Sequence, residues 1–499
     1  MEILGNLAHG FGVALSFTNL LFALIGALIG TAIGVLPGIG PVATISLLLP
    51  ITFGQPATTA IIMLAGIYYG AQYGGSTTAI LLNLPGEISS VVTTLEGYKM
   101  ARNGRAGAAL ATSALSSFFA GTVATILVAA SGPVLTKVAL SFGPADYFSL
   151  MLLGLIISAV LAQGSVLKSV CMVVLGVALG LVGTDVQTGQ QRFTFGVPEL
   201  SDGIGFVAVA MGMFGIAEII LNLERPEARS VLKTKVGSLF LTREEFSRAW
   251  PSTLRGTVTG SVLGILPGGG AALASFGSYM MERKVSRGRH LFGQGAIEGV
   301  AGPEAANNAA AQTSFIPLLT LGIPANAVMA LMVGALIIQG IQPGPRMVEA
   351  QPDLFWGLIA SMWIGNVMLL VINLPMIGMW VKLLQVPYKY LYPSILIFCC
   401  IGVYSLNNNV FDVYMTVLFA VFGVMCNKLK MEPAPLLIGF VLGPMMEEHL
   451  RRAMLLSRGD PMVFLERPIS ATMLGIGAVA LLAMMLPNLR KGKEAALAG

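Results

Sequence analysis

Short runs of proline and glycine interrupt two long apolar segments of this sequence and point to the chemistry it could perform. The clearer run, residues 264–270, lies in the middle of residues 256–281, a stretch without any charged residue. Proline removes a helical hydrogen bond and glycine is a poor helix former, so the run predicts a break between two helical arms. In hydrocarbon, the backbone groups freed at a break must be satisfied by protein or by a water-filled cavity. The run therefore indicates a transport site inside a membrane.

A second copy of this pattern lies near the N-terminus. Residues 30–40 read GTAIGVLPGIG and residues 260–270 read GSVLGILPGGG, at an offset of 230 in a chain of 499 residues. Paired interruptions in the two halves of a chain are typical of the binding site of a secondary transporter. The alternative is a flexible kink in each of two ordinary membrane helices.

The helix that starts after each break exposes unpaired N–H groups and the positive end of its dipole, which suit a carboxylate. Neighbouring amide and hydroxyl side chains can donate to a carboxylate without the cost of a buried charge. We therefore predict that a carboxylate substrate binds among residues at or near the breaks. These residues are Pro37, Gly38, Gly40, Ser76, Thr77, Pro267, Gly268, Gly269, Gly270, Asn307, Asn308, Thr313 and Ser314.

A second pair of interruptions, Asn83 to Glu87 and Gly322 to Ala325, supplies candidates for a coupling cation. Carbonyl groups at the end of a broken helix suit a sodium ion. For any single polar residue, the alternative is an interhelical hydrogen bond that holds the bundle together. The predicted cation-binding residues are Gly38, Asn83, Pro85, Gly86, Gly268, Thr320, Pro324 and Asn326.

Other titratable residues give weaker signals. Gly302-Pro303-Glu304 resembles a helix start, where proline and an acid are both favoured; the alternative for Glu304 is a role in binding a cation or a proton. Glu218 and the pair Glu447–Glu448 are expected at helix ends near the membrane interface. The three histidines are isolated and predict no proton relay. The four cysteines lack metal or redox spacing and are expected to be buried.

Composition indicates an integral membrane protein with little soluble mass. The chain is 55% hydrophobic and 11% charged, with a mean hydropathy of +0.80, whereas soluble domains are about 25% charged. Roughly 11 or 12 apolar segments could span a bilayer by the ~20-residue criterion. The predicted fold class is therefore an all-α polytopic membrane protein.

The net charge of +5 does not indicate nucleic-acid binding, because the basic residues fall in short loops. The N-terminus lacks the basic region that is typical of a cleaved signal peptide.

The charges of the loops predict the topology. The basic loop 99–105 and the connector 224–255 are expected in the cytoplasm, and the acidic loop 185–202 outside. In the second half the pattern is exchanged, with a basic loop at 283–289 and a neutral one at 339–345. This exchange predicts two inverted-topology repeats. We assign residues 1–223 to the first repeat, 224–255 to a basic cytoplasmic connector, 256–468 to the second repeat, and 469–499 to an additional transmembrane helix with a cytoplasmic tail.

Basic residues flank both ends of residues 256–281, so both ends are expected on the cytoplasmic side. Arms of about 10–13 residues reach only the middle of a ~30 Å hydrocarbon core. This stretch is therefore predicted to be a re-entrant hairpin. The first copy is either a hairpin that enters from the outside or a kink in a full span.

The motifs together resemble the large membrane subunit of the tripartite tricarboxylate transporter family (TctA-like) over essentially the whole chain. The motifs that carry the resemblance are the two Leu-Pro-Gly-x-Gly breaks, Asn83-Leu84-Pro85-Gly86-Glu87, Pro303-Glu304-Ala305-Ala306-Asn307-Asn308 and Thr320-Leu321-Gly322-Ile323-Pro324. Ala325 departs from the pattern, because a glycine is expected after Ile-Pro, and it puts the bend at this break in doubt.

The resemblance implies a permease of the bacterial inner membrane that works with a small membrane subunit and a periplasmic substrate-binding protein. It implies uptake of carboxylates such as citrate, driven by a cation gradient. The coupling ion is usually sodium, and a proton is the other possibility. No further cofactor is expected. Together with the architecture it suggests an elevator-type movement of the broken helices against a scaffold. The alternatives are an uncoupled anion channel and, more remotely, an intramembrane enzyme, for which no catalytic motif is present.

Overall fold

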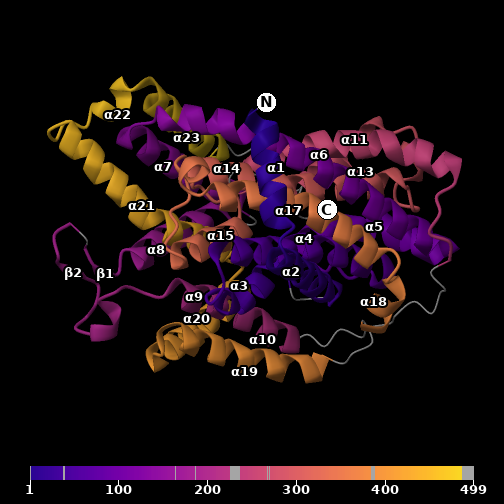
Figure 1. Ribbon diagram of the computed structural model, residues 1–499, viewed down its shortest axis with the longest axis horizontal. Coiled ribbons are helices and arrows are strands. Elements are labelled where there is room, and N and C mark those ends of the chain that lie inside the picture. Colours follow the sequence, from indigo (N-terminus) through magenta and orange to yellow (C-terminus); the bar gives the residue numbers. More distant parts are fainter. Residues whose placement is uncertain are drawn as a thin grey trace.

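The protein is built from helices, with a single two-stranded hairpin in the part of the chain that the structure describes (Figure 1). This computed structural model describes residues 2–36, 40–162, 165–185, 187–224, 237–266, 268, 270–383 and 388–485. Six helical stretches within these ranges are long and apolar enough to cross a membrane, and five shorter apolar helices accompany them. The predicted class, an all-α polytopic membrane protein, is confirmed.

The first half contains α1 (Glu2–Ala14), α2 (Phe17–Val35), α3 (Pro41–Thr52), α4 (Ala57–Leu82), α5 (Val91–Met100), α6 (Ala106–Leu140), α7 (Pro144–Leu161), α8 (Val166–Gly180), β1 (Gly183–Thr184), β2 (Gln191–Arg192), α9 (Phe206–Ala210) and α10 (Ala217–Glu224). A 3₁₀ turn, η1 (Ile88–Ser90), precedes α5, and two π-helical stretches, η2 (Ala101–Arg105) and η4 (Met211–Ile216), continue α5 and α9.

The second half contains α11 (Arg243–Ile265), α12 (Gly270–Val285), α13 (Glu298–Thr313), α14 (Phe315–Leu321), α15 (Ala327–Ile338), α16 (Met347–Ala350), α17 (Pro352–Asn373), α18 (Ile377–Leu383), α19 (Tyr388–Asn407), α20 (Val410–Lys428), α21 (Ala434–Leu456), α22 (Val463–Glu466) and α23 (Pro468–Met485). Two short 3₁₀ turns, Pro198–Leu200 and Arg289–Leu291, lie in loops.

Both Pro-Gly runs separate two helices, as predicted. Helix α2 ends at Val35 and α11 at Ile265, and the next residue in each case, Leu36 or Leu266, is extended. Each of these leucines precedes a proline, which disfavours the helical conformation of the residue before it. The chain becomes helical again at Pro41 and at Gly270.

The arms around the second run are longer than predicted. Helix α11 begins at Arg243, inside the predicted connector, because Thr242 and Glu245 form a capping box at its N-terminus. The N-terminal lead-in to the first run is divided into α1 and α2 at Leu15 and Ser16.

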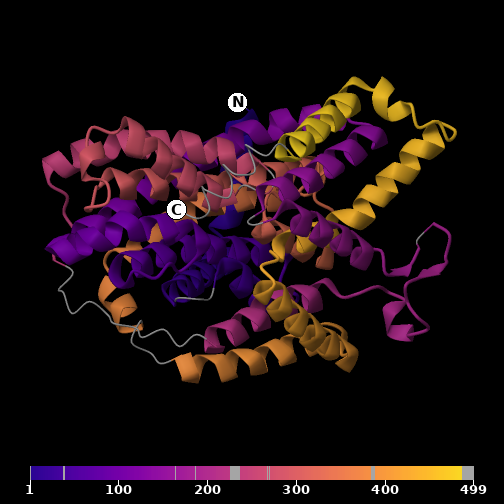
Figure 2. The same cartoon turned by 180° about the vertical axis from the view of Figure 1, so that it is seen from behind.

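Glycines bring α2 into direct backbone contact with α4, and α11 into direct backbone contact with α13. A Cβ atom on any of six glycines would overlap a backbone carbonyl of the neighbouring helix, so only glycine fits. On α2, Gly26, Gly30 and Gly34 face Met63, Ile67 and Ala71 of α4; on α11, Gly256, Gly260 and Gly264 face Gly302, Ala306 and Ala310 of α13. Glycine at every fourth residue is the spacing that permits such close packing in membranes. The residue numbers rise together, so each pair of helices runs parallel, and Figures 1 and 2 show α11 beside α13.

Polar contacts join segments that are far apart in the sequence. One group of pairs consists of Asp185–Arg451, Arg192–Glu447, Asp146–Arg467 and Gln339–Gln55. Another consists of Lys99–Gly293, Arg105–Glu245, Lys168–Leu429 and Lys428–Glu224.

Several predictions for single residues are wrong. Glu447 does not lie at a helix end, because α21 continues to Leu456 while Glu447 pairs with Arg192 and Arg451. His9 is not isolated, since it bonds Asp353. Cys171 and Cys400 are exposed on the protein surface, whereas Cys399 and Cys426 are buried as expected.

We predict that alanine at Gly30 or Gly260 destabilises the protein, although alanine is the better helix former by about 1 kcal/mol. The added Cβ would overlap a backbone carbonyl that cannot move independently of its helix, and overpacking of this kind costs about 1–3 kcal/mol. Thermal unfolding of the purified variants measures the effect. Gly475→Ala, at a helical position with open space around it, is the control and should unfold at or above the wild-type temperature.

Asp185 yields a prediction about pH. The backbone N–H of Gln187 and the Arg451 guanidinium hydrogen-bond its carboxylate and lower the pKa of Asp185 to about 2. A lowered folded-state pKa stabilises the protein above the unfolded value, 3.8 here, and this stabilisation disappears as the pH falls through the folded value. The melting temperature of Asp185→Asn should therefore lie below wild type above pH 4, and the gap should close between about pH 4 and pH 2. A gap that persists at pH 2 would contradict the assignment.

Candidate functional site

The second pair of interruptions has the same backbone design in both halves. Asn83 caps the C-terminus of α4 and Gly322 that of α14, and both residues adopt the left-handed conformation, with φ of 59° and 75°. This conformation ends a helix and suits glycine and asparagine best. A proline follows two residues later, and the next segment is then capped by Glu87 or Asn326. The Asn326 side chain accepts the Met329 N–H at 3.0 Å. The departure at Ala325 therefore does not remove the break.

The second hairpin tip touches the second-half interruption. The N–H of Gly268 donates to the Ala325 carbonyl at 2.7 Å. Gly270, the first residue of α12, faces the Asn326 amide, and the Nδ2 atom of Asn326 has no hydrogen-bond partner in the described structure. On its other side Gly268 lies against Ser158 of α7. The tip thus carries a free amide donor beside the N-terminus of a helix.

The C-terminal end of the first Pro-Gly run, which we call the first tip, is approached by an acid. Gly40, which precedes α3, donates its N–H to the Glu218 carboxylate at 3.4 Å. Glu218 was expected near the membrane interface, but its helical run extends from Phe206 to Glu224 and its carboxylate points at the break. A carboxylate from the chain itself therefore occupies the N-terminus at which a substrate carboxylate was predicted to bind.

Glu304 lies at the centre of a buried ring of hydroxyl groups. Its carboxylate accepts hydrogen bonds from Ser76 at 2.7 Å and Ser113 at 3.0 Å, and from Thr93. Ser117 lies 3.5 Å away. These donors come from α4, α5 and α6, all in the first half of the chain, whereas Glu304 is on α13. The ring therefore joins the two halves in the interior.

The expected helix start at Gly302-Pro303-Glu304 is wrong. Helix α13 begins at Glu298, whose carboxylate is paired with Arg248, and Pro303 lies inside the helix. Glu304 is consequently a mid-helix residue, 1% exposed, and the alternative role considered for it, in binding a cation or a proton, is the one that its surroundings favour.

The amides next to Glu304 extend the polar cluster. Asn307 donates to the Glu87 carboxylate at 3.3 Å, and the Ser89 hydroxyl lies between Glu87 and the Gln72 amide oxygen. Asn308 donates to Ser117 at 2.7 Å. The Tyr68 hydroxyl faces Gln72, and also Ser314 and Asn326 on the second-half interruption. One continuous set of polar side chains thus links both second interruptions.

The structure brings together Ser76, Asn307, Asn308, Ser314 and Asn326 among the predicted site residues. Gly86 lies against Gly34 and Gly75, Gly40 bonds Glu218, and Gly268 and Gly270 form the second tip. Other predicted residues are not in the cluster. The hydroxyls of Thr77, Thr313 and Thr320 donate to carbonyls of their own helices. The Asn83 and Pro85 side chains are exposed, and Pro324 is buried. Pro37, Gly38, Pro267 and Gly269 lie outside the described residues.

Sequence reasoning missed Gln72, Ser89, Thr93, Ser113 and Ser117. The only local signal was the spacing of Ser113 and Ser117, which places two hydroxyls on one face of the apolar helix α6. The others lie far from Glu304 in the sequence and are identified only once α4, α5 and α6 pack around α13.

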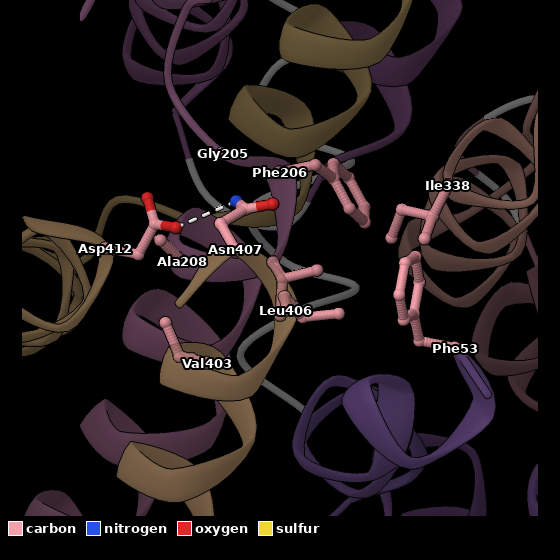
Figure 3. A pocket seen from close by; sticks show the side chains of 10 residues that line it. Phe53, Gly205, Phe206, Ala208, Ile338, Val403, Leu406, Asn407 and Asp412 are labelled. Carbon is pink, nitrogen blue, oxygen red and sulfur yellow. Dashed lines mark hydrogen bonds between the residues drawn. The ribbon is translucent and has the colours of Figure 1, made fainter. Parts of the chain in front are cut away.

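A separate cavity of about 160 Å³ opens between the ends of α3, α9, α15, α19 and α20 (Figure 3). It is lined mainly by apolar side chains such as Phe53, Phe206 and Ile338. Its polar pair, Asn407 and Asp412, is joined by a hydrogen bond of 2.8 Å. An acid at this position repels a carboxylate, and the cavity contains none of the donors found in the interior cluster, so it does not suit a carboxylate substrate.

These features define a polytopic helical membrane protein whose interior polar groups gather at interrupted helices. The chain belongs to the tripartite tricarboxylate transporter TctA family, which matches residues 20–438. This finding agrees with the resemblance drawn from its motifs.

Two proteins of Agrobacterium vitis are similar to it. One, described as "Uncharacterized 52.8 kDa protein in TAR-I ttuC' 3'region", is 58% identical over 494 residues, which cover 99% of this chain and 98% of that protein. The other, described as "Uncharacterized protein in TAR-II ttuC' 3'region", is 60% identical over 235 residues, which cover 47% of this chain and 97% of that protein. No solved structure matches the chain.

Proposed function

We propose that this protein is the large permease subunit of a secondary transporter that imports tricarboxylates or related carboxylates across the bacterial inner membrane. It works with a small membrane subunit and a periplasmic binding protein, and a cation gradient, of sodium by family expectation, drives uptake. The observation that carries the proposal is the buried cluster in which Ser76 and Glu87 of one half meet Glu304 and Asn307 of the other. Family membership supports the class of substrate and the partners.

The donors at the cluster suit a carboxylate. The N-terminus of α12 at Gly270 and the free Nδ2 donor of Asn326 lie together at the second tip. A helix N-terminus attracts anions through its unpaired N–H groups and its dipole. The Gly40 N–H at the first tip is engaged by Glu218. We infer that Glu218 holds the first tip closed to anions until the substrate carboxylate replaces it.

We infer that the two halves of the chain have inverted topology. If residues 1–223 and 256–468 are inverted repeats, α2–α3 is a hairpin that enters from the outside and α11–α12 one that enters from the cytoplasm. The exchange of loop charges and the parallel glycine contacts α2–α4 and α11–α13 support this arrangement. Under it, the tail after α23 is cytoplasmic.

The two tips rest against helices outside the glycine-packed pairs, with Gly268 on α7 and Gly40 on α10. We infer an elevator-type movement in which the broken helices slide as one body along α7 and α10. Inward-facing and outward-facing structures in which both tips kept their contacts with Ser158 and Glu218 would contradict this movement.

Uptake into proteoliposomes tests the function directly. Labelled di- and tricarboxylates are supplied to vesicles containing this chain with its small subunit and binding protein, with and without a sodium gradient. We expect uptake that saturates with substrate and needs the gradient. Uptake that neither saturates nor depends on a cation would instead identify an uncoupled anion channel.

Asn307→Ala should abolish this uptake, because it removes the amide that links the two halves at Glu87. Asn373→Ala is a matched control. That asparagine is also buried, on α17, but its amide bonds only Leu369 of its own helix and Thr31. Equal transport by the two variants would remove Asn307 from the site.

Gly268→Leu should likewise abolish uptake while leaving folded protein in the membrane. Gly268 has a φ of +80°, and a Cβ there would lie 2.8 Å from the Ser158 Cα atom, so the tip must shift away from α7. Size-exclusion chromatography establishes that the variant is folded. Normal uptake by folded Gly268→Leu would show that the tip does not need this position.

A further inference from the structure

Glu304 differs from the other deeply buried acids in the described part of the chain by having no positive or backbone partner. Three of these acids pair with arginines and one accepts backbone N–H groups. The arginine pairs are Asp146–Arg467, Glu282–Arg255 and Glu298–Arg248, and Glu96 accepts from Gly293, Gly295 and Ala296. Asp185, near the surface, has both kinds of partner. The partners of the Glu304 carboxylate are hydroxyl groups only.

Hydroxyl groups do not neutralise a carboxylate. A buried charge costs several kcal/mol unless it is paired or neutralised. Two titratable groups face Glu304 from the elements around it, the Tyr73 phenol on α4 and the Glu87 carboxylate. The phenol is uncharged and the carboxylate increases the cost, so neither supplies a positive charge. Glu282 on α12 and Glu96 on α5 pack against Gly302 and Gly299, nearer the start of α13, and each has its own partners. The positive charge must therefore come from outside the chain.

We propose that Glu304 is the binding site of the coupling cation, a monovalent ion taken up with the carboxylate substrate. This inference rests on the proposed function. A sodium ion would take the carboxylate oxygens and the hydroxyl oxygens of Ser76, Thr93, Ser113 and Ser117 as ligands, which are the hard oxygen donors such an ion prefers. A proton would convert Glu304 to a neutral acid that donates one hydrogen bond to a hydroxyl. In both cases one positive charge neutralises the ring.

The position of the ring explains why the cation and substrate would move together. Asn307 is one turn along α13 from Glu304, and its amide bonds Glu87 while its Oδ1 atom, in a side chain that is 1% exposed, has no partner in the described structure. An anionic substrate next to the uncompensated Glu304 and Glu87 would be repelled, and the low dielectric makes that repulsion strong. A cation at Glu304 removes one of these charges. The carboxylate of the substrate can then bind at the donors of the cluster, the N-terminus of α12 and the Nδ2 atom of Asn326.

The test uses proteoliposomes with the full transporter, driven either by a sodium gradient at equal pH or by a pH gradient without sodium. Wild type should respond to one of the two, which identifies the ion. Glu304→Gln should lose accumulation at least tenfold under that gradient. If the ion is a proton, this variant should still exchange labelled for unlabelled substrate, because glutamine mimics the neutral acid; if it is sodium, exchange should be lost as well. Accumulation at the wild-type level, with the wild-type cation dependence, would overturn the proposal.

Hydroxyl variants make the test independent of the charge change. Ser113→Ala should raise the half-saturating sodium concentration about tenfold or shift the pH midpoint by about one unit, the effect of one lost hydrogen bond to a charged group. Ser116→Ala is the matched control, because this buried serine of the same helix bonds Thr253 instead of Glu304. Equal shifts in the two variants would contradict the assignment.

A binding measurement separates this inference from the proposed function. If wild type transports no carboxylate, the proposed function fails, and the melting temperature of the purified protein is then titrated with sodium chloride against choline chloride and with pH. A cation-dependent rise in wild type that is absent in Glu304→Gln supports a cation site at Glu304. The same rise in both proteins would overturn it. If Glu304→Gln does not fold, Ser113→Ala replaces it, and its rise should need about tenfold more cation than the rise in wild type.

Discussion

Direct backbone contact between α2 and α4, and between α11 and α13, is the constraint on which the rest of the structure depends. The contact requires glycine at every fourth position, and it fixes how far each broken helix extends along its neighbour. At Leu36 and Leu266 the broken helix ends, while α4 and α13 continue beyond it. Thr78 of α4 donates to the Val35 carbonyl at the end of α2, and Thr313 of α13 lies against Gly264 near the end of α11.

The hydrogen-bonding and ion-pair partners of buried acids differ between the ends of the helices and the interior of the protein. Toward the loops, buried acids such as Asp146 and Glu298 are matched with arginines. In the interior cluster the described part of the chain supplies amides and hydroxyls but no base, so Glu304 and Glu87 have no positively charged neighbour there. A structural ion pair would satisfy these acids permanently, whereas neutral donors leave them able to exchange a mobile cation. We therefore interpret the interior cluster as a binding site and the arginine–carboxylate pairs near the loops as structural contacts.

The sequence predicted the interrupted helices well, because proline and glycine act locally. Leu36 and Leu266 are forced out of the helical conformation by the prolines that follow them, whatever surrounds them. Local signals failed where the decisive neighbour is distant in sequence. Pro303 looked like a helix start, but α13 begins earlier, at Glu298, which pairs with Arg248. Glu447 looked like a helix end, but ion pairs with Arg192 and Arg451 satisfy it within a longer helix. The hydroxyl ring around Glu304 could not be predicted, since it depends on how α4, α5 and α6 pack.

The central claim is that an anion and its cation bind inside the protein, between the interrupted helices. Cryo-electron microscopy of the transporter in lipid nanodiscs, with a transported carboxylate and the coupling ion present, tests this claim most directly. The account predicts density for the carboxylate bounded by Ser76, Asn307 and Asn326, close to Gly270. Density for the carboxylate in the cavity beside Phe53 and Asp412 instead, with the interior cluster unchanged, would contradict it.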